Sequence, residues 1–268
     1  MDSSYGLDLN KPLYDGRYSW FDHSKFGGTV YEPKPNDPST RTTDPIVTGT
    51  SVLAVKYKGG VAIAADTLLS YGSLARFRDI RRIHKLNEHT IIGSSGEYSD
   101  FQYITRMLDD VVTDNHIADN NLQPMDPKSI FSYLSRVMYQ RRNKQDPLYN
   151  NIVVAGYRNG ESFLGSVDLL GTHYQDDHIA TGFGDHIARP LLRNAYKPDL
   201  TKEEAVKLLE KCLTVLFYRD ARAYYRVQIC TIGEDGVNIA EPQVLQTDWS
   251  VGNVTYGYDG RRTALPQA

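Results

Sequence analysis

The stretch TGTSVLAVKYKGGVAIAAD (Thr48–Asp66) holds two short apolar runs on either side of a Lys-Gly-Gly turn signal. The runs Ser51–Tyr57 and Val61–Thr67 therefore predict a β-hairpin. The hydroxyl of Thr50 precedes the first strand, and the carboxylate of Asp66 closes the second. Because 49 residues precede Thr50, this hairpin and its hydroxyl begin well inside the chain.

The segments that follow the hairpin alternate between strand and helix patterns in pairs. Periodicity, turn signals and capping signals predict a strand at 90–95, helices at about 98–115 and 126–143, a hairpin at 151–170 that turns at Asn159-Gly160, a strand at 178–183, helices from about 184 and from 201, and a closing hairpin at 227–239. Strand pairs and helix pairs in separate runs favour an α+β fold of stacked layers over a doubly wound sheet.

Composition limits the classes of partner and of site. The 268 residues carry a formal net charge of -3, so no broad positive field favours nucleic acid or an anionic membrane surface, and we expect protein or peptide partners. The two cysteines, Cys212 and Cys230, lie in apolar patterns, which indicates buried thiols in a reducing compartment. No histidine stands at ligand spacing from a carboxylate or thiol, so we expect neither a metal nor a cofactor.

Four short motifs resemble, in their order along the chain, the landmarks of proteasome beta subunits. They are Ala64-Ala65-Asp66, Ile92–Gly96 (IGSSG), Thr181–Gly184 (TGFG) and Tyr218–Ala221 (YRDA). The resemblance covers about residues 48–246 and implies the four-layer αββα sandwich of the N-terminal-nucleophile hydrolases. The stretch Ser70–Arg78 (SYGSLARFR) is most similar to a non-catalytic member of the beta ring.

The resemblance implies a specific chemistry for the catalytic members of the family. In those members a Gly-Thr bond cuts itself, and the exposed threonine uses its own α-amino group as the base. Thr50 follows Gly49 and stands 16 positions before Asp66, which matches the family's interval. A threonine hydroxyl needs a proton acceptor, and a peptide nitrogen cannot serve as one, so an uncut Thr50 is inert.

Three positions depart from the catalytic pattern. Arg82 stands where the catalytic members have a lysine, and its guanidinium stays charged, so we expect a structural pair with Asp66 instead. Phe183 replaces a serine between two glycines, and Ala223 replaces the serine that follows the Asp220 motif. Gly96 still matches the glycine whose N–H stabilises the oxyanion in active members, although a glycine that closes a strand needs no catalytic reason.

These departures predict a vestigial site made of Thr50, Asp66, Arg82, Gly96, Phe183, Asp220 and Ala223, in a subunit that is not itself an enzyme. Two alternatives stay open. One is an active N-terminal threonine endopeptidase that uses Thr50, and the other is a free-standing module that binds peptides in the old cleft. An active enzyme would need Arg82 to replace the lysine and water to replace two serine hydroxyls.

The resemblance also divides the chain into three segments. It implies a propeptide at 1–41, removed by a cut at Arg41-Thr42, a beta-type core at 42–246 and a C-terminal extension at 247–268 that reaches the opposite beta ring. The implied partners are other alpha and beta proteasome subunits and protein substrates in the chamber. The implied location is the cytoplasm and nucleus.

The basic run of Arg76, Arg78, Arg81 and Arg82 predicts contact with carboxylates of an adjacent subunit, or a solvated loop.

Overall fold

The hairpin expected at residues 51–67 is present as β2 (Val52–Tyr57) and β3 (Gly60–Asp66). The structure is a computed structural model that describes residues 44–118 and 124–249. Both strands are buried on both faces, which explains their nearly continuous apolar sequence. Because side chains alternate across a strand, Leu53 and Val55 enter one core layer, whereas Val52 and Ala54 enter another.

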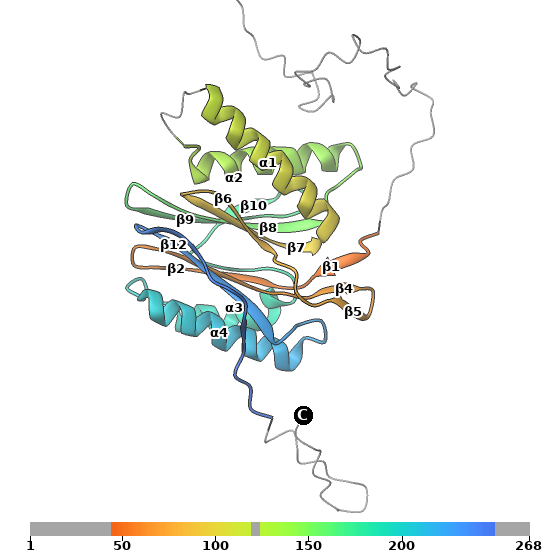
Figure 1. The fold of residues 1–268 in the computed structure, drawn as a ribbon, viewed down its shortest axis with the longest axis vertical. Coiled ribbons are helices and arrows are strands. Elements are labelled where there is room, and N and C mark those ends of the chain that lie inside the picture. The colour runs from red at the N-terminus through yellow and green to blue at the C-terminus, as the bar shows by residue number, and fades with distance from the viewer. Residues whose placement is uncertain (1–43, 119–123, 250–268) are drawn as a thin grey trace, which may run out of the picture. The chain divides into compact units, whose positions relative to one another are not determined.

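Two antiparallel sheets form the centre of the described part of the chain (Figure 1). The first follows the order β10 (His173–Gln175), β9 (Glu161–Val167), β8 (Asn150–Arg158), β7 (Thr90–Glu97), β1 (Val47–Gly49), β4 (Leu69–Tyr71), β5 (Leu74–Phe77), with β6 (Ile83–Asn87) paired to β7. The second follows the order β11 (His178–Ala180), β2, β3, β12 (Arg226–Gly233), β13 (Gly236–Ile239), with β14 (Gln243–Val244) paired to β12.

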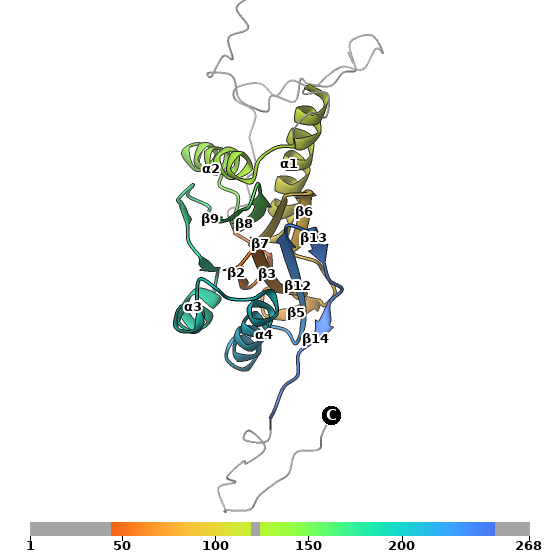
Figure 2. The ribbon, with the colours of Figure 1, turned by 90° about the vertical axis from the view of Figure 1, so that its left-hand side faces the viewer.

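A pair of helices covers the outer face of each sheet (Figures 1 and 2). Helices α1 (Tyr98–Ala118) and α2 (Pro127–Asn143) pack on the first sheet, and α3 (Gly184–Ala195) and α4 (Lys202–Arg219) pack on the second. A third apolar layer, which includes Ile63, Ile91 and Val153, joins the inner faces of the two sheets. The described residues therefore form the four-layer αββα sandwich, and the expected α+β class is confirmed.

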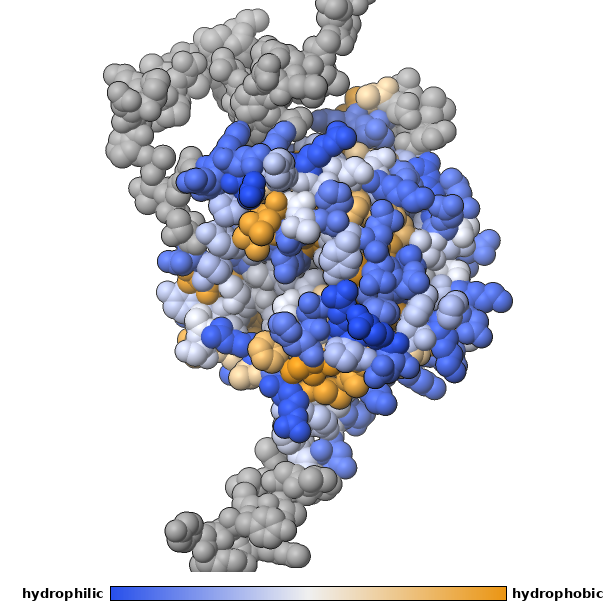
Figure 3. All heavy atoms as spheres, turned by 180° about the vertical axis from the view of Figure 1, so that it is seen from behind, coloured by the Kyte–Doolittle hydropathy of each residue, from blue (hydrophilic) through white to orange (hydrophobic). Residues whose placement is uncertain are grey.

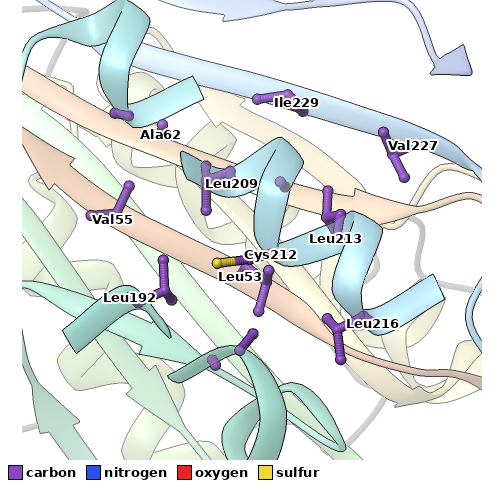
Figure 4. Close-up of a cluster of buried hydrophobic side chains, with 14 of the residues drawn as sticks. Leu53, Val55, Ala62, Leu192, Leu209, Cys212, Leu213, Leu216, Val227 and Ile229 are labelled. Atoms are coloured by element: carbon purple, nitrogen blue, oxygen red, sulfur yellow. The ribbon is translucent and has the colours of Figure 1, made fainter. Parts of the chain in front are cut away.

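The predicted start of α4 is confirmed at the level of single hydrogen bonds. The Thr201 hydroxyl accepts from the Glu204 N–H at 3.3 Å, and the Glu204 carboxylate accepts from the Thr201 N–H at 2.9 Å. This capping box satisfies two donors that the first turn leaves free. From there α4 lays Leu209, Cys212 and Leu213 onto β2 and β3, as Figure 4 shows.

The turn between β8 and β9 also follows its sequence signal. Asn159 and Gly160 have φ values of 52° and 83°, the left-handed pair that a type I′ turn requires. Several short strands had no such signal and were not expected, namely β1, β4, β5, β6, β10 and β14. Runs of two to five residues carry too little periodicity to predict a strand. Most of these segments are strands because they pair with a neighbouring strand in the sheet.

Candidate active site

The predicted site residues gather at one end of the sandwich, around a pocket of about 370 Å³. Thr50, Gly96, Phe183 and Asp220 line it, and they come from four segments far apart in the sequence. Asp66 and Arg82 lie behind Thr50 and are buried. Ala223 is half-buried and packs against the apolar core under α4, so it adds no polar group to the pocket.

The Thr50 hydroxyl donates to the Asp220 carboxylate, with 2.7 Å between Oγ1 and Oδ2. The Ser51 hydroxyl lies 3.4 Å from the same Oγ1. Thr50 directly follows β1, so its nitrogen belongs to the peptide bond with Gly49 and offers no lone pair. The nearest proton acceptor to the Thr50 hydroxyl is therefore the Asp220 carboxylate and not an amine of the threonine itself.

The expected pair of Asp66 with Arg82 is present and buried. Arg82 Nη2 donates to Asp66 Oδ1 at 2.6 Å. The other Asp66 oxygen accepts the Tyr224 N–H at 3.1 Å. Burial raises the pKa of the Asp66 carboxyl, while the Arg82 guanidinium and the backbone N–H partners act in the opposite direction.

Arg82 uses its full donor capacity on structural acceptors. Besides Asp66 Oδ1, its guanidinium donates to the carbonyl oxygens of Thr50, Ser51, Asp66 and Ser94 at 2.9–3.1 Å. These five bonds equal the number of N–H groups on a guanidinium. Arg82 is 2% exposed, and its side chain also lies against Gly49, where an added Cβ would stand 2.5 Å from Arg82 Cδ. Arg82 therefore fastens the backbone around Thr50 and has no donor left for a reacting group.

Gly96 is fixed by its backbone conformation. Its φ is +96°, and an added Cβ would meet the Tyr149 carbonyl oxygen at 2.1 Å. Steric constraints alone therefore require glycine at this position, and no oxyanion-binding role of the Gly96 N–H is needed to explain it. In the sheet, Gly96 stands opposite Gly49 of β1, so the uncut chain lies against the place where an oxyanion would have to form.

The turn that carries serine in the catalytic members has a different role here. The Gly184 N–H donates to Ser51 Oγ at 2.7 Å, which holds the turn against the start of β2. Phe183, between the two glycines, is 52% exposed and contacts the ring of His186. A phenyl ring can neither donate nor accept a proton, so Phe183 gives the pocket an apolar wall.

The gap between β4 and β7 is filled by the chain itself. In β1, Thr48 stands opposite Ser70 of β4 and opposite Glu97 of β7. The Glu97 side chain accepts the N–H groups of Ile46 and Val47 at 2.5 and 2.9 Å. Sequence reasoning missed Glu97, because its role follows from the register of β1 on β7. Its position next to Gly96 was the only signal available.

The basic run is split by the fold, which corrects one expectation. Arg82 is buried and cannot reach another subunit. Arg81 pairs with Glu241 of the same chain, at 2.6 Å between Nη2 and Oε2. Arg76 and Arg78 are exposed on and beside β5, and Arg81 is also exposed, so these three side chains stay available for the predicted contact.

Within residues 44–118 and 124–249, no group of three or more metal-ligating side chains comes together. None of the helices described has the length and apolar character needed to cross a membrane. The predicted propeptide, its cut at Arg41-Thr42 and the extension beyond Trp249 lie outside the described residues.

The fold and the site together define a class of protein. Two sheets between helix pairs, with a threonine at the entry to the central hairpin, form the N-terminal-nucleophile hydrolase architecture. The threonine nitrogen is joined to Gly49 in this chain, and the neighbouring arginine is committed to backbone carbonyls. The chain belongs to the proteasome subunit family, whose model, described as "Proteasome subunit", matches residues 46–232.

Curated relatives agree with this assignment over most of their length. The chain is 50% identical over 224 residues to proteasome subunit beta type-4 of Xenopus laevis, covering 83% of this chain and 92% of the relative. It is 49% identical over 247 residues to proteasome subunit beta type-4 of Dictyostelium discoideum, covering 91% and 94%. It is 43% identical over 233 residues to proteasome subunit beta type-7 of Saccharomyces cerevisiae, covering 82% and 87%.

Proposed function

We propose that this chain is a non-catalytic structural subunit of the beta ring of the 20S proteasome core particle. One observation carries the proposal: the chain upstream of Thr50 occupies the sheet position beside Gly96 as β1. A substrate strand would have to displace β1 before it reached the Thr50 hydroxyl. The lack of a free amine and the commitment of Arg82 point in the same direction.

In this role the subunit completes the ring, forms part of the chamber wall and supports ATP- and ubiquitin-dependent protein degradation by its neighbours. The leader would be a propeptide, cut at Arg41-Thr42 by an active neighbouring subunit, which leaves several residues before Thr50. The expected location is the cytoplasm and nucleus, where proteasomes work. The buried free thiols of Cys212 and Cys230 suit a reducing compartment.

The start of the C-terminal extension is anchored on α4, which supports a role in joining half-particles. Trp249 packs edge-on against Tyr218, with ring centroids 4.8 Å apart, and it also contacts Phe217. The Tyr218 hydroxyl accepts the Asp248 N–H at 2.7 Å. Such an anchor would fix the direction in which the following residues leave the core toward the opposite beta ring.

Two exposed surfaces fit contact with ring neighbours. The β4–β5 hairpin exposes Tyr71, Leu74 and Phe77, and Arg76 lies over the Phe77 ring. Apolar rings beside guanidinium groups are typical of protein interfaces, and the expected partner surface carries carboxylates. Seen from behind, the described residues also show an apolar patch toward their lower end (Figure 3).

The decisive test uses a threonine-directed electrophile on the purified particle, followed by mass spectrometry of each subunit. We expect adducts on the catalytic beta subunits and none on Thr50 of this chain. The catalytic subunits of the same particle serve as the internal control for labelling. An adduct on Thr50 would support the active endopeptidase instead, and the 2.7 Å contact between Thr50 and Asp220 is the observation that keeps this alternative testable.

The size of the native particle distinguishes the ring subunit from the alternative of a free-standing peptide-binding module. Sedimentation of the protein from its native source should place this chain in a particle of several hundred kilodaltons. A stable monomer would contradict the ring subunit and favour the module.

A further inference from the structure

The entry of β1 into the sheet is held by a buried carboxylate. Glu97 is 9% exposed, and its Oε2 accepts two successive main-chain N–H groups, those of Ile46 and Val47, at 2.5 and 2.9 Å. Its Oε1 accepts the Ser99 hydroxyl at 2.9 Å. Hydrogen bonds to an ionised acceptor are among the stronger ones in proteins, so this is a specific receptor for the upstream backbone.

The backbone of Glu97 is itself fixed on both sides. Its N–H donates to the Tyr149 carbonyl at 2.9 Å, and its carbonyl accepts from the Asn150 side chain at 2.8 Å. The carboxylate is therefore preorganised, and little conformational entropy is lost when it binds the strand.

The segment borders an apolar pocket, and a backbone hydrogen bond from the β4–β5 turn adds a second contact that holds it. Ile46 and Val47 form part of the lining of an apolar pocket of about 430 Å³, together with Leu69, Phe77 and Tyr98. The Gly72 N–H donates to the Ile46 carbonyl at 3.3 Å, which adds a bond from the β4–β5 turn. Without this segment, β4 would present an unpaired sheet edge, β7 would lose its partner at Gly96 and Glu97, and the Glu97 carboxylate would lose its two main-chain donors.

We infer that Glu97 is the positioning residue that retains residues 46–49 in the cleft and sets the limit of leader trimming. The inference rests on the proposed function, because a neighbouring active subunit must hydrolyse the leader. Each such hydrolysis consumes one water and leaves a new amine on the retained chain. A cut upstream of Ile46 leaves the Glu97 contacts in place, and a cut just before Ile46 would convert one of them into an ion pair with the new amine. A cut between Ile46 and Thr50 would release β1 from its receptor.

The experiment compares particles that carry wild-type chain, Glu97→Ala, Glu97→Gln and Ser99→Ala. Intact mass of the subunit gives its N-terminal residue, and hydrogen exchange reports on the amides of Ile46 and Val47. We expect a wild-type start upstream of Ile46, with both amides protected. Glu97→Ala should add starts between Val47 and Thr50 and speed exchange about 10- to 100-fold, the equivalent of a charged hydrogen bond.

Two variants serve as matched controls. Glu97→Gln keeps an acceptor of the same shape and should give a smaller change than Glu97→Ala. Ser99→Ala removes only the outer contact of the carboxylate and should keep the wild-type start. The inference is overturned if Glu97→Ala gives the wild-type start and the wild-type exchange rates.

Wild-type particles alone also decide the question if Glu97→Ala is not incorporated. Exchange of Ile46 and Val47 at the rate of free peptide would overturn the inference. Failure of the proposed function is recognised separately, by an electrophile adduct on Thr50 or by a stable monomer in sedimentation. Rapid exchange without that adduct contradicts only the role of Glu97.

Discussion

At the scale of single residues, an arginine at position 82, where the catalytic members have a lysine, gives the position beside Thr50 a structural role. A lysine offers three N–H donors on a point charge, whereas the guanidinium of Arg82 reaches five acceptors from a nearly unexposed position. The result is a backbone clamp around the threonine. The spacing of the sequence predicted that Arg82 pairs with Asp66. The four contacts of Arg82 with carbonyl oxygens could not be predicted, because they depend on the folded backbone.

The variant Arg82→Lys should be less stable and still inactive. It leaves at least two buried acceptors without a donor, which should lower the free energy of unfolding by about 1–3 kcal/mol in urea denaturation. Activity should not appear with peptide substrates, because β1 and the Thr50 peptide bond remain. Arg81→Lys is the matched control, and since its pair with Glu241 is exposed we expect a clearly smaller change in the free energy of unfolding than for Arg82→Lys. Equal effects of the two variants would contradict the clamp.

The variant Gly96→Ala separates a steric role from a catalytic one. Its Cβ would collide with the Tyr149 carbonyl at a φ of +96°, so we expect a loss of more than about 1–2 kcal/mol, or failure to enter the particle. Gly160→Ala is the control, because Gly160 has a φ of +83° and no atom within 4 Å of an added Cβ. If thermal unfolding midpoints fall equally in both variants, backbone conformation alone explains Gly96.

At the scale of elements, helix α4 shows how a local signal becomes a structural boundary. Thr201 and Glu204 bond each other's backbone N–H groups, and the helix then buries Leu209, Leu213 and Leu216. Strand β1 shows the opposite case. Three residues without a capping or turn signal become a strand only because β4 and β7 flank them.

Removal of the α4 cap should have a modest and local cost. Thr201→Ala loses the hydroxyl acceptor and should destabilise the protein by about 1 kcal/mol, seen as a lower thermal unfolding midpoint. Thr201→Ser retains the hydroxyl and should stay close to the wild type. A midpoint for Thr201→Ala that equals that of Thr201→Ser would argue against an energetic role of the capping box.

At the scale of the whole molecule, the three apolar layers make both thiols inaccessible. Cys212 lies between α4 and the second sheet, and Cys230 lies between the two sheets. Burial raises the pKa of each thiol to about 12. The thiolate is the reactive form, so the thiols are both covered and protonated at neutral pH.

We therefore expect neither thiol to react with iodoacetamide at pH 8 in the native particle, whereas both should react in denaturant. Peptide mapping by mass spectrometry gives the modified fraction at each cysteine. Rapid native labelling of Cys230 would mean that the two sheets separate, contrary to the packed inter-sheet layer.

Deletion of residues 250–268 tests the role of the extension in assembly. The aromatic anchor of Trp249 stays in place, so the core should fold, while half-particles should accumulate if the extension makes the proposed link to the opposite ring. Native mass measurement reports the ratio of half-particles to full particles. Unchanged assembly would remove the extension from the proposed function.

The sequence by itself determined the central hairpin, the four helices, the type I′ turn, the layered α+β class and the family. Each of these follows from periodicity, capping, turn chemistry or motif order, which are local properties of the chain. It also indicated an inert site, because Phe183 and Ala223 lack the groups that proton transfer needs.

Only the tertiary structure decided that β1 fills the gap between β4 and β7, that Glu97 holds it there and that Arg82 binds four carbonyl oxygens. The physical reason is that these contacts join residues separated by 12 to 51 positions, and their partners are mostly backbone groups. Backbone groups are the same in every residue, so no side-chain pattern along the chain reveals which of them will meet.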